Sequence, residues 1–415
     1  MPVWAIPILY TVVSVAAAVV VPRLEHSYAF GLVAPLSPSS ALAALSAIAS
    51  GMMALTGIVF SVAFIMLQFS AVTYSPRFAT RFARDPLLFH ALGVFFATFM
   101  YALAATVWVD REGSGTVPFI SWMIALALLI ASLLMFTLLV RRLGDLQITS
   151  SLRFIGDQGR MVIRATQAAM RAGFEGSAAV SGPPGAPGEA PGQTLRFGGT
   201  PRYVTRVDLA ALVALAEGAG CRIELDCAVG DMVTEGTVLL HVFGAAGLPP
   251  RPLLRAIGLG PERTFEQDPK YPIRLLVDIA IKALSPAIND PTTAVQALDQ
   301  IEDLLRRLAR RPLADGRLHG AGGVLRVLVP TPSWSDYLAL SFDEIRMFGT
   351  TSVQVMRRLR SALAALIEEL GADARAAPVQ HYLQHIDAVI DRSALDDLDR
   401  SAARQEDPQG LGLTR

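Results

Sequence analysis

Four long stretches near the start of the chain contain no Asp, Glu, Lys or Arg. They cover residues 3–21, 41–69, 86–109 and 117–140, and an apolar run of about 20 residues is long enough to cross a bilayer as a helix. At ~1.5 Å per residue the second stretch is about 43 Å long, which exceeds the ~30 Å hydrocarbon core. The pattern predicts four transmembrane helices, the second of which tilts or extends beyond the membrane.

Small and polar residues form a stripe along the second predicted helix. Their spacings of four, three and seven place them on one face; they are Ser46, Ser50, Ala54, Gly57, Ser61 and Gln68. One interpretation is a packing seam, because small residues let helix backbones approach closely in lipid. The other is the lining of a pore or substrate path. The absence of an ionisable residue from the stripe favours the seam.

The arginines beside the predicted spans indicate the orientation of the chain. Arg77, Arg81 and Arg84 follow the second span, Arg141 and Arg142 end the fourth, and the other two loops have one arginine each. Loops rich in Lys and Arg stay on the cytoplasmic side. Both termini, and everything after the fourth span, are therefore predicted to be cytoplasmic. The first three of these arginines form a candidate basic collar at the cytoplasmic membrane surface.

Composition divides the chain into six predicted parts. They are a transmembrane domain over 1–142, a helical connector over 143–175, a disordered Gly/Pro linker over 176–194, a small β-rich module over 195–247, a mainly helical domain over 248–400 and a disordered tail over 401–415. The predicted fold class is an α-helical membrane protein with four N-terminal transmembrane helices and an α+β cytoplasmic domain. The hydrophobic fraction of 52% agrees with a membrane portion.

The β-rich module is predicted from alternation. Apolar and charged side chains alternate from Cys221 to Cys227, as in a half-buried strand. The segment GDMVTEGTVL, residues 230–239, resembles half of a barrel-sandwich hybrid, the fold of biotinyl and lipoyl carriers. A carrier displays a lysine on a hairpin, and the module contains none, so we expect no cofactor.

Two helices are predicted to meet at a corner bracketed by prolines. Its candidate ligand-binding residues are Ser285, Asn289, Asp290, Thr292 and Thr293, because a helix N-terminus favours anions and the threonines add hydroxyl groups. Asp290, however, is placed to cap the second helix with its own negative charge. A structural corner is therefore the favoured interpretation.

Several classes of function find no support in the sequence. The formal net charge is +0, whereas a nucleic-acid-binding domain is usually basic. There is no phosphate loop, dinucleotide fingerprint or nucleophile elbow. His381 and His385 lie four apart without the glutamate of a metalloprotease motif, and two cysteines are too few for a structural zinc site. We therefore expect no nucleic-acid partner, no metal and no familiar enzyme site.

One family resemblance covers nearly the whole chain. VDIAIKALSPAINDPTTAVQALD (277–299), QDPKYPIR just before it, FDEIRMFG (342–349) and GIVFSVAFIMLQFSAVTYSPR in the second span are similar, in the same order, to the bacterial predicted membrane proteins of family DUF2254, a domain of unknown function. The resemblance implies an integral protein of the bacterial inner membrane with N-terminal spans and a cytoplasmic domain. It supplies no catalytic residues.

Two hypotheses for function remain. The first is a homo-oligomeric channel or transport-type protein for ions or a small solute, with the stripe beside the path, the collar at its mouth favouring anions, and the cytoplasmic domain assembling and gating the subunits. The second is a membrane-anchored sensor or scaffold whose cytoplasmic domain binds a small ligand or a protein. Proteins that transport nothing also carry basic cytoplasmic loops, so the collar does not separate the two hypotheses.

Overall fold

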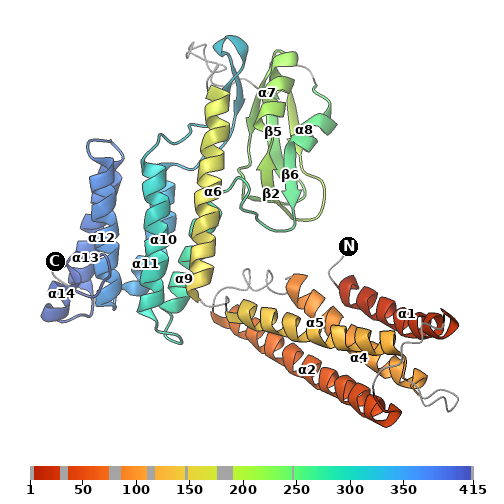
Figure 1. The fold of residues 1–415 in the computed structure, drawn as a ribbon. Helices are drawn as coiled ribbons and strands as arrows, with labels where there is room; N and C mark the ends of the chain where they lie inside the picture. Colours follow the sequence, from red (N-terminus) through yellow and green to blue (C-terminus); the bar gives the residue numbers. More distant parts are fainter. Residues whose placement is uncertain are drawn as a thin grey trace. The chain divides into compact units, whose positions relative to one another are not determined.

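The computed structural model describes residues 4–28, 36–73, 86–109, 117–144, 148–174, 190–244 and 247–412. The chain forms two compact units, Met1–Gln147 and Ile148–Arg415, and each is considered by itself (Figure 1).

The first unit is made of apolar helices. They are α1 (Ala5–Tyr28), α2 (Pro38–Thr73), α4 (Pro86–Ala105) and α5 (Phe119–Gly144), with the short 3₁₀ turn η1 (Thr106–Trp108) after α4. Within the described residues, four helices are long and apolar enough to cross a membrane. The prediction of four apolar N-terminal helices is confirmed.

Helix α4 lies at the centre of the first unit and packs against α1, α2 and α5. Gly93 lets α1 approach, because a Cβ at this position would lie 3.1 Å from the Cγ of Tyr10. Phe95 is fully buried in the interior. The hydroxyl groups of Thr98 and Ser132 are hydrogen-bonded at 2.8 Å between α4 and α5, which satisfies two polar groups inside the bundle. Side chains of α4 thus fill the middle of the unit.

Helix α2 uses one face for this packing. The buried residues recur every three or four positions, as on one side of a helix; they are Ala41, Leu45, Ala49, Met52, Thr56 and Val59. The Thr56 hydroxyl donates a hydrogen bond to the Met52 carbonyl at 2.7 Å. This face therefore brings no unsatisfied hydroxyl group to the contact with α4.

The second unit is α+β and contains two β-sheets with different numbers of strands. Its strands are β1 (Gln193–Arg196), β2 (Arg202–Val207), β3 (Arg222–Leu225), β4 (Met232–Val233), β5 (Val238–Phe243), β6 (Ile257–Gly260), β7 (Arg317–His319) and β8 (Leu325–Leu328). The five-stranded sheet has the order β1-β5-β3-β8-β7 and the three-stranded sheet the order β4-β2-β6. Their core also contains side chains of α7 (Leu209–Gly218) and α8 (Pro250–Ala256).

The two sheets also include strands that lie outside the predicted module of residues 195–247. Strand β6 pairs with β2, and β8 pairs in parallel with β3, with Ile223 opposite Val327. Strand β1 begins at Gln193, within the segment predicted as linker; the Gln193 side chain is hydrogen-bonded to both the N–H and the C=O of Leu248. Residues 176–189 of that predicted linker lie outside the described residues.

The helices of the second unit that follow or flank these sheets form what we call the helical body (Figure 1). They are α6 (Ile148–Phe174), α9 (Lys270–Ala283), α10 (Pro291–Ala309), α11 (Trp334–Gly349), α12 (Val353–Leu370), α13 (Ala376–Arg392) and α14 (Asp397–Ala403). Ser333 and Asp336 form a capping box at the start of α11, as their spacing predicts.

The C-terminal segment differs from the predicted disordered tail. Residues 401–412 have a defined path, and the Arg357 Nε donates to the Ala402 carbonyl at 2.6 Å. The Asp407 side chain is buried and accepts from the Gln409 N–H at 2.9 Å. Contacts made by residues far apart in sequence therefore order a segment whose local composition carries no strong signal.

A short ion pair joins a turn of the sheets to the start of α9. Asp268 is 2% exposed, accepts from Arg263 Nη2 at 2.5 Å, and also accepts from the Lys270 and Tyr271 N–H groups. Burial raises the pKa of Asp268, although Arg263 opposes this shift. A Cβ on Gly230, whose φ is +96°, would lie 2.5 Å from the Asp268 carboxylate. This buried charge is paired, as burial requires.

Replacing Gly159 by alanine should loosen the contact between α6 and α10. A Cβ there would lie 2.7 Å from both methyl groups of Leu304, and overpacking of this kind costs about 1–3 kcal/mol. Hydrogen exchange of the α6 and α10 amides should become faster. Gly218→Ala is the matched control, because nothing lies within 4 Å of a Cβ at that position. Unchanged exchange in Gly159→Ala would contradict the close contact.

Candidate functional site

The small-residue stripe of α2 faces away from the helices of its own unit. Ser46, Ser50, Gly57 and Ser61 are all exposed, and nothing lies within 4 Å of a Cβ at Gly57. At about 100° per residue, the stripe is centred roughly 150° around the helix from the face that packs on α4. Gln68 belongs to α2, but its side chain is not among those described. Among the described residues of the first unit, no helix therefore packs on the exposed positions of the stripe.

The hydroxyl groups of the stripe are bonded to their own helix. Ser50 Oγ donates to the Ser46 carbonyl at 2.7 Å, and Ser61 Oγ donates to the Gly57 carbonyl at 2.9 Å. Each oxygen keeps lone pairs that can accept a further hydrogen bond. The stripe thus tolerates an apolar environment and also offers acceptors to a polar one.

The predicted basic collar lies outside the described residues. Arg77, Arg81 and Arg84 fall between the end of α2 and the start of α4. Their arrangement stays a prediction.

The proline-bracketed corner lies between α9 and α10, and two of its residues, Asp290 and Thr293, are hydrogen-bonded to each other. Asp290 accepts from the Thr293 N–H at 3.1 Å and from the Thr293 hydroxyl at 2.6 Å, so it caps α10 as its position predicts. Ser285 Oγ donates to the Lys282 carbonyl at 2.6 Å. Asn289 has φ +50°, a left-handed conformation that asparagine adopts more readily than most residues. Thr292 is exposed.

These bonds leave the corner little unused capacity for an anion. The amide that a ligand would use at the start of α10 already binds the Asp290 carboxylate, whose charge would repel an anion. The geometry of the corner matches that of a helix start held by its own cap.

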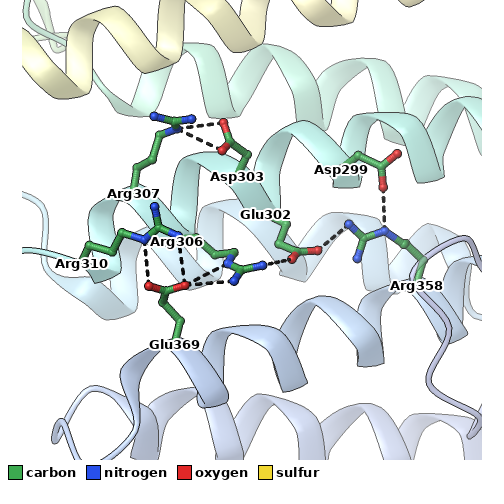
Figure 2. A network of polar contacts seen from close by, with 8 residues as sticks. All are labelled: Asp299, Glu302, Asp303, Arg306, Arg307, Arg310, Arg358 and Glu369. Carbon is green, nitrogen blue, oxygen red and sulfur yellow. Dashed lines mark hydrogen bonds and ion pairs between the residues drawn. The ribbon is translucent and has the colours of Figure 1, made fainter.

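A charged groove between α10 and α12 is a polar feature that sequence reasoning missed (Figure 2). It has a volume of ≈ 360 Å³ and is lined by Asp299, Glu302, Asp303, Arg306, Arg307, Arg310 and Arg358. Figure 2 shows Arg358 and Glu369 reaching across from α12 to the charged side chains of α10.

Arg358 is the most buried charge of this groove. Its side chain is 4% exposed; Nε donates to Asp299 at 2.8 Å and Nη2 donates to Glu302 at 2.5 Å. Glu369, further along α12, accepts from Arg306 at 3.0 Å and from Arg310 at 2.8 Å. A buried guanidinium is tolerated only when it is paired in this way. These ion pairs therefore hold α12 against α10.

The groove extends to α6 through another ion pair. Arg160 Nη1 donates to Asp303 at 2.8 Å, and Asp303 also accepts from Arg307 at 3.0 Å. Burial raises the pKa of Asp303, but the hydrogen bonds from Arg307 and Arg160 outweigh burial and leave that pKa below its usual value. Hydrogen bonds from Arg310 and Arg306 lower the pKa of Glu369. Carboxylates whose pKa is lowered by such pairing are expected to stabilise the folded state as anions.

Part of this network was readable in the sequence. The pairs Glu302–Arg306 and Asp303–Arg307 lie four apart on one helix, a spacing that brings side chains together. Arg274 and Asp278 also pair at this spacing, and Arg274 additionally reaches Glu344 on α11 at 2.7 Å. The partners on other helices carry no local signal.

The described residues hold no cluster that suits a metal ion. No group of three or more His, Cys, Asp and Glu side chains among them is placed to bind one. Asp268, Asp278 and Asp290 do not converge on a cation, since each has its own partner: Arg263, Arg274 and Thr293. Cys221 and Cys227 are buried free thiols, and burial raises the pKa of both.

Comparison with known proteins gives a family but no activity. A family model described as "Predicted membrane protein (DUF2254)" matches residues 2–365. An uncharacterized protein of Mycobacterium bovis and one of Mycobacterium tuberculosis are each 29% identical over 375 residues, which are 88% of this chain and 71% of theirs. No solved structure gives a significant match.

Acidification should destabilise the helical body. Hydrogen bonds from Arg274 lower the pKa of Glu344, and those from Arg310 and Arg306 lower the pKa of Glu369. Carboxylates with a depressed folded pKa contribute stability that is present above the unfolded value, about 4.3, and is lost as the pH falls through the folded value. The thermal midpoint should therefore be lower at pH 3.5 than at pH 6.

The matched comparison is Glu344→Gln, which removes one of these charges. Its midpoint should depend less steeply on pH below about 4.3 than that of the wild type. Equal pH dependence in the two proteins would show that the pairing of Glu344 with Arg274 contributes no stability.

Proposed function

Because the chain belongs to the DUF2254 family of predicted membrane proteins, we propose that it is a homo-oligomeric channel or transport-type protein of the bacterial inner membrane. Its four apolar helices suit an integral membrane protein. The substrate class is an ion or a small solute, and an anion is favoured by the arginines that follow α2.

The observation that carries the proposal is the free face of α2. The stripe is exposed on the helix side opposite to the contact with α4, and small residues are the kind that lets another helix backbone approach closely in lipid. Another copy of α2 is the partner we propose for this face. The serine hydroxyls Ser50 and Ser61 would then lie between subunits.

A path between copies fits the interior of the first unit better than a path through one copy. Helix α4 occupies the centre, and Phe95 and Tyr101 on it are 0% and 1% exposed. Side chains of such volume leave an interior packed like an organic crystal. Several copies arranged around the stripe would instead enclose a path lined by hydroxyl groups.

The orientation completes the proposal. Arg141 near the end of α5, and the arginines that follow α2, favour the cytoplasmic side for both segments. The second unit would then be cytoplasmic, with Arg77, Arg81 and Arg84 at the mouth of the path. We retain the half barrel-sandwich at residues 230–239 as a proposal for the segment that contains β4 and the start of β5, two strands that belong to different sheets.

The second unit would hold the subunits together and control the path. Helix α6 follows α5 after three residues and is fastened to α10 by Gly159 and by the Arg160–Asp303 pair. A shift of the helical body would therefore be carried along α6 toward the end of α5. This coupling supports a gating role for the second unit.

The alternative function is a membrane-anchored sensor or scaffold. It would need a ligand or protein site on the second unit, and the corner from Ser285 to Thr293 is the residue set that the sequence suggests. Ser285, Asp290 and Thr293 already make hydrogen bonds within the chain, which argues against a ligand site at this corner. The exposed face of α2 therefore supports the oligomer more strongly than the corner supports the sensor or scaffold.

Gly57→Leu should weaken assembly, because a leucine would separate helices that meet at the stripe. Gly51→Leu is the matched control: both glycines lie on α2 with open space around a Cβ, but Gly51 points about 120° away from Gly57. Light scattering of the purified proteins in detergent should give a smaller mass for Gly57→Leu only. Equal masses for the two variants would remove α2 from the interface.

Ion flux through liposomes tests the path itself. Wild-type protein should conduct; Ser61→Leu should reduce the flux by narrowing the path, and Arg81→Glu should lower or reverse anion preference by changing the charge at its mouth. Gly51→Leu again serves as the control and should conduct like the wild type. Wild-type vesicles without flux over a range of salts, pH values and membrane tension would favour the sensor or scaffold.

A further inference from the structure

Exposed apolar side chains gather where α11 ends. Met347 is 62% exposed and Phe348 is 50% exposed, although both are large hydrophobic residues near the end of a well-packed helix. The next residue, Gly349, is buried, and a Cβ there would lie 2.6 Å from Val355 and 3.7 Å from Leu284. The end of α11 therefore lies beside the start of α12 and the end of α9.

The corner between α9 and α10, which begins beside Gly349 at Leu284, also carries exposed apolar residues. Pro286 and Ala287 are exposed, and Ile288 is partly exposed. Residues 284–288 and 347–352 contain no charged side chain. We call the surface formed by Pro286, Ala287, Ile288, Met347 and Phe348 the apolar end patch. A contiguous exposed apolar patch is a feature of surfaces that contact a protein or a membrane.

Helix α6 begins at the same end of the helical body. Gly156 contacts Gln300 and Gly159 contacts Leu304, so α6 and α10 run in the same direction. At 1.5 Å per residue, α6 begins about 12 Å before Gly156 and α10 begins about 14 Å before Gln300. The start of α10 borders the corner, and the start of α6 is therefore level with the apolar end patch.

The start of α6 is tied to a candidate membrane span. Helix α5, which is long and apolar enough to cross a membrane, ends at Gly144, and α6 begins at Ile148. Four Cα–Cα steps separate Gly144 from Ile148, and a fully extended chain of that length spans at most about 14 Å. The start of α6 therefore lies within about 14 Å of the end of this candidate span, and the patch is at the same end of the helical body as the start of α6.

We propose that the apolar end patch is a membrane-contact surface that inserts Met347 and Phe348 into the boundary between lipid headgroups and acyl chains. Apolar side chains at such a boundary are buried about 5–10 Å deep, and the patch has no charge that insertion would desolvate. The short tether selects the bilayer as the occupant, because it links the end of the helical body that carries the patch to a candidate membrane span whatever the oligomeric state. The inference does not depend on the protein being a channel.

Spin labelling of the full chain in phosphatidylcholine–phosphatidylglycerol vesicles tests this inference. A nitroxide is attached to Phe348→Cys, and to Ala372→Cys as the matched control. Ala372 is also exposed, but it lies beyond the far end of α12, about 27 Å along the helix from Val353. Cys221 and Cys227 are buried, and labelling of the wild type measures their background.

Relaxation by oxygen and by a water-soluble nickel chelate distinguishes the outcomes. The label at position 348 should be relaxed more by oxygen, as in lipid, and the label at 372 more by nickel, as in water. Nickel-dominated relaxation at both positions would overturn the proposal. Shielding from both agents at 348, with spin–spin broadening, would instead identify a second copy as the occupant and would also overturn it. If Phe348→Cys does not fold, Ala287→Cys provides the same comparison within the patch.

Discussion

The close contact of α6 with α10 is the interaction on which the second unit depends. Glycines at positions 156 and 159 remove the side chains that would hold the two helices apart, and Leu304 occupies the space beside Gly159. The Arg160–Asp303 pair then fixes the register of the contact. Because α6 is the first segment after α5, this contact attaches the helical body to the part of the chain that follows the last span.

Ion pairs connect α6 and α10 with a further helix of the helical body, α12. Asp303 and its neighbours on α10 connect α6 on one side with Arg358 and Glu369 on the other (Figure 2). The arginines and carboxylates of the groove largely neutralise one another, so it is a structural network and not a strong field for a charged ligand. The surfaces left free are of a different kind: the stripe of α2 in one unit and the apolar end patch in the other. Both suit partners found in or at a membrane.

The first unit shows why a sequence stripe needs a structure before it can be interpreted. Periodicity placed Ser46, Ser50, Gly57 and Ser61 on one face, but it did not reveal which face α2 uses within its own bundle. The structure gives that role to the apolar residues on the other side, such as Leu45 and Met52. Among the described residues the stripe is exposed, and the proposals for assembly and for a path between subunits begin from that observation.

Local sequence by itself determined the features whose physics is local. Uncharged runs determined the four apolar helices, because in lipid every backbone polar group must be bonded within the segment. Asp290 and Ser333 marked helix starts, because a cap bonds only to amides two or three residues ahead. The strand at 222–225 was visible from alternation. The family resemblance was also carried by local motifs.

Only the tertiary structure decided which distant segments meet. Strand β3 pairs with β8 about one hundred residues later, Arg358 finds Asp299 and Glu302 on another helix, and the tail orders around Asp407. Burial of a given side chain depends on what folding brings against it, and neither period nor composition encodes that partner. Met347 and Phe348 look like core residues in the sequence; the structure leaves them exposed because α11 ends where the chain turns back into α12.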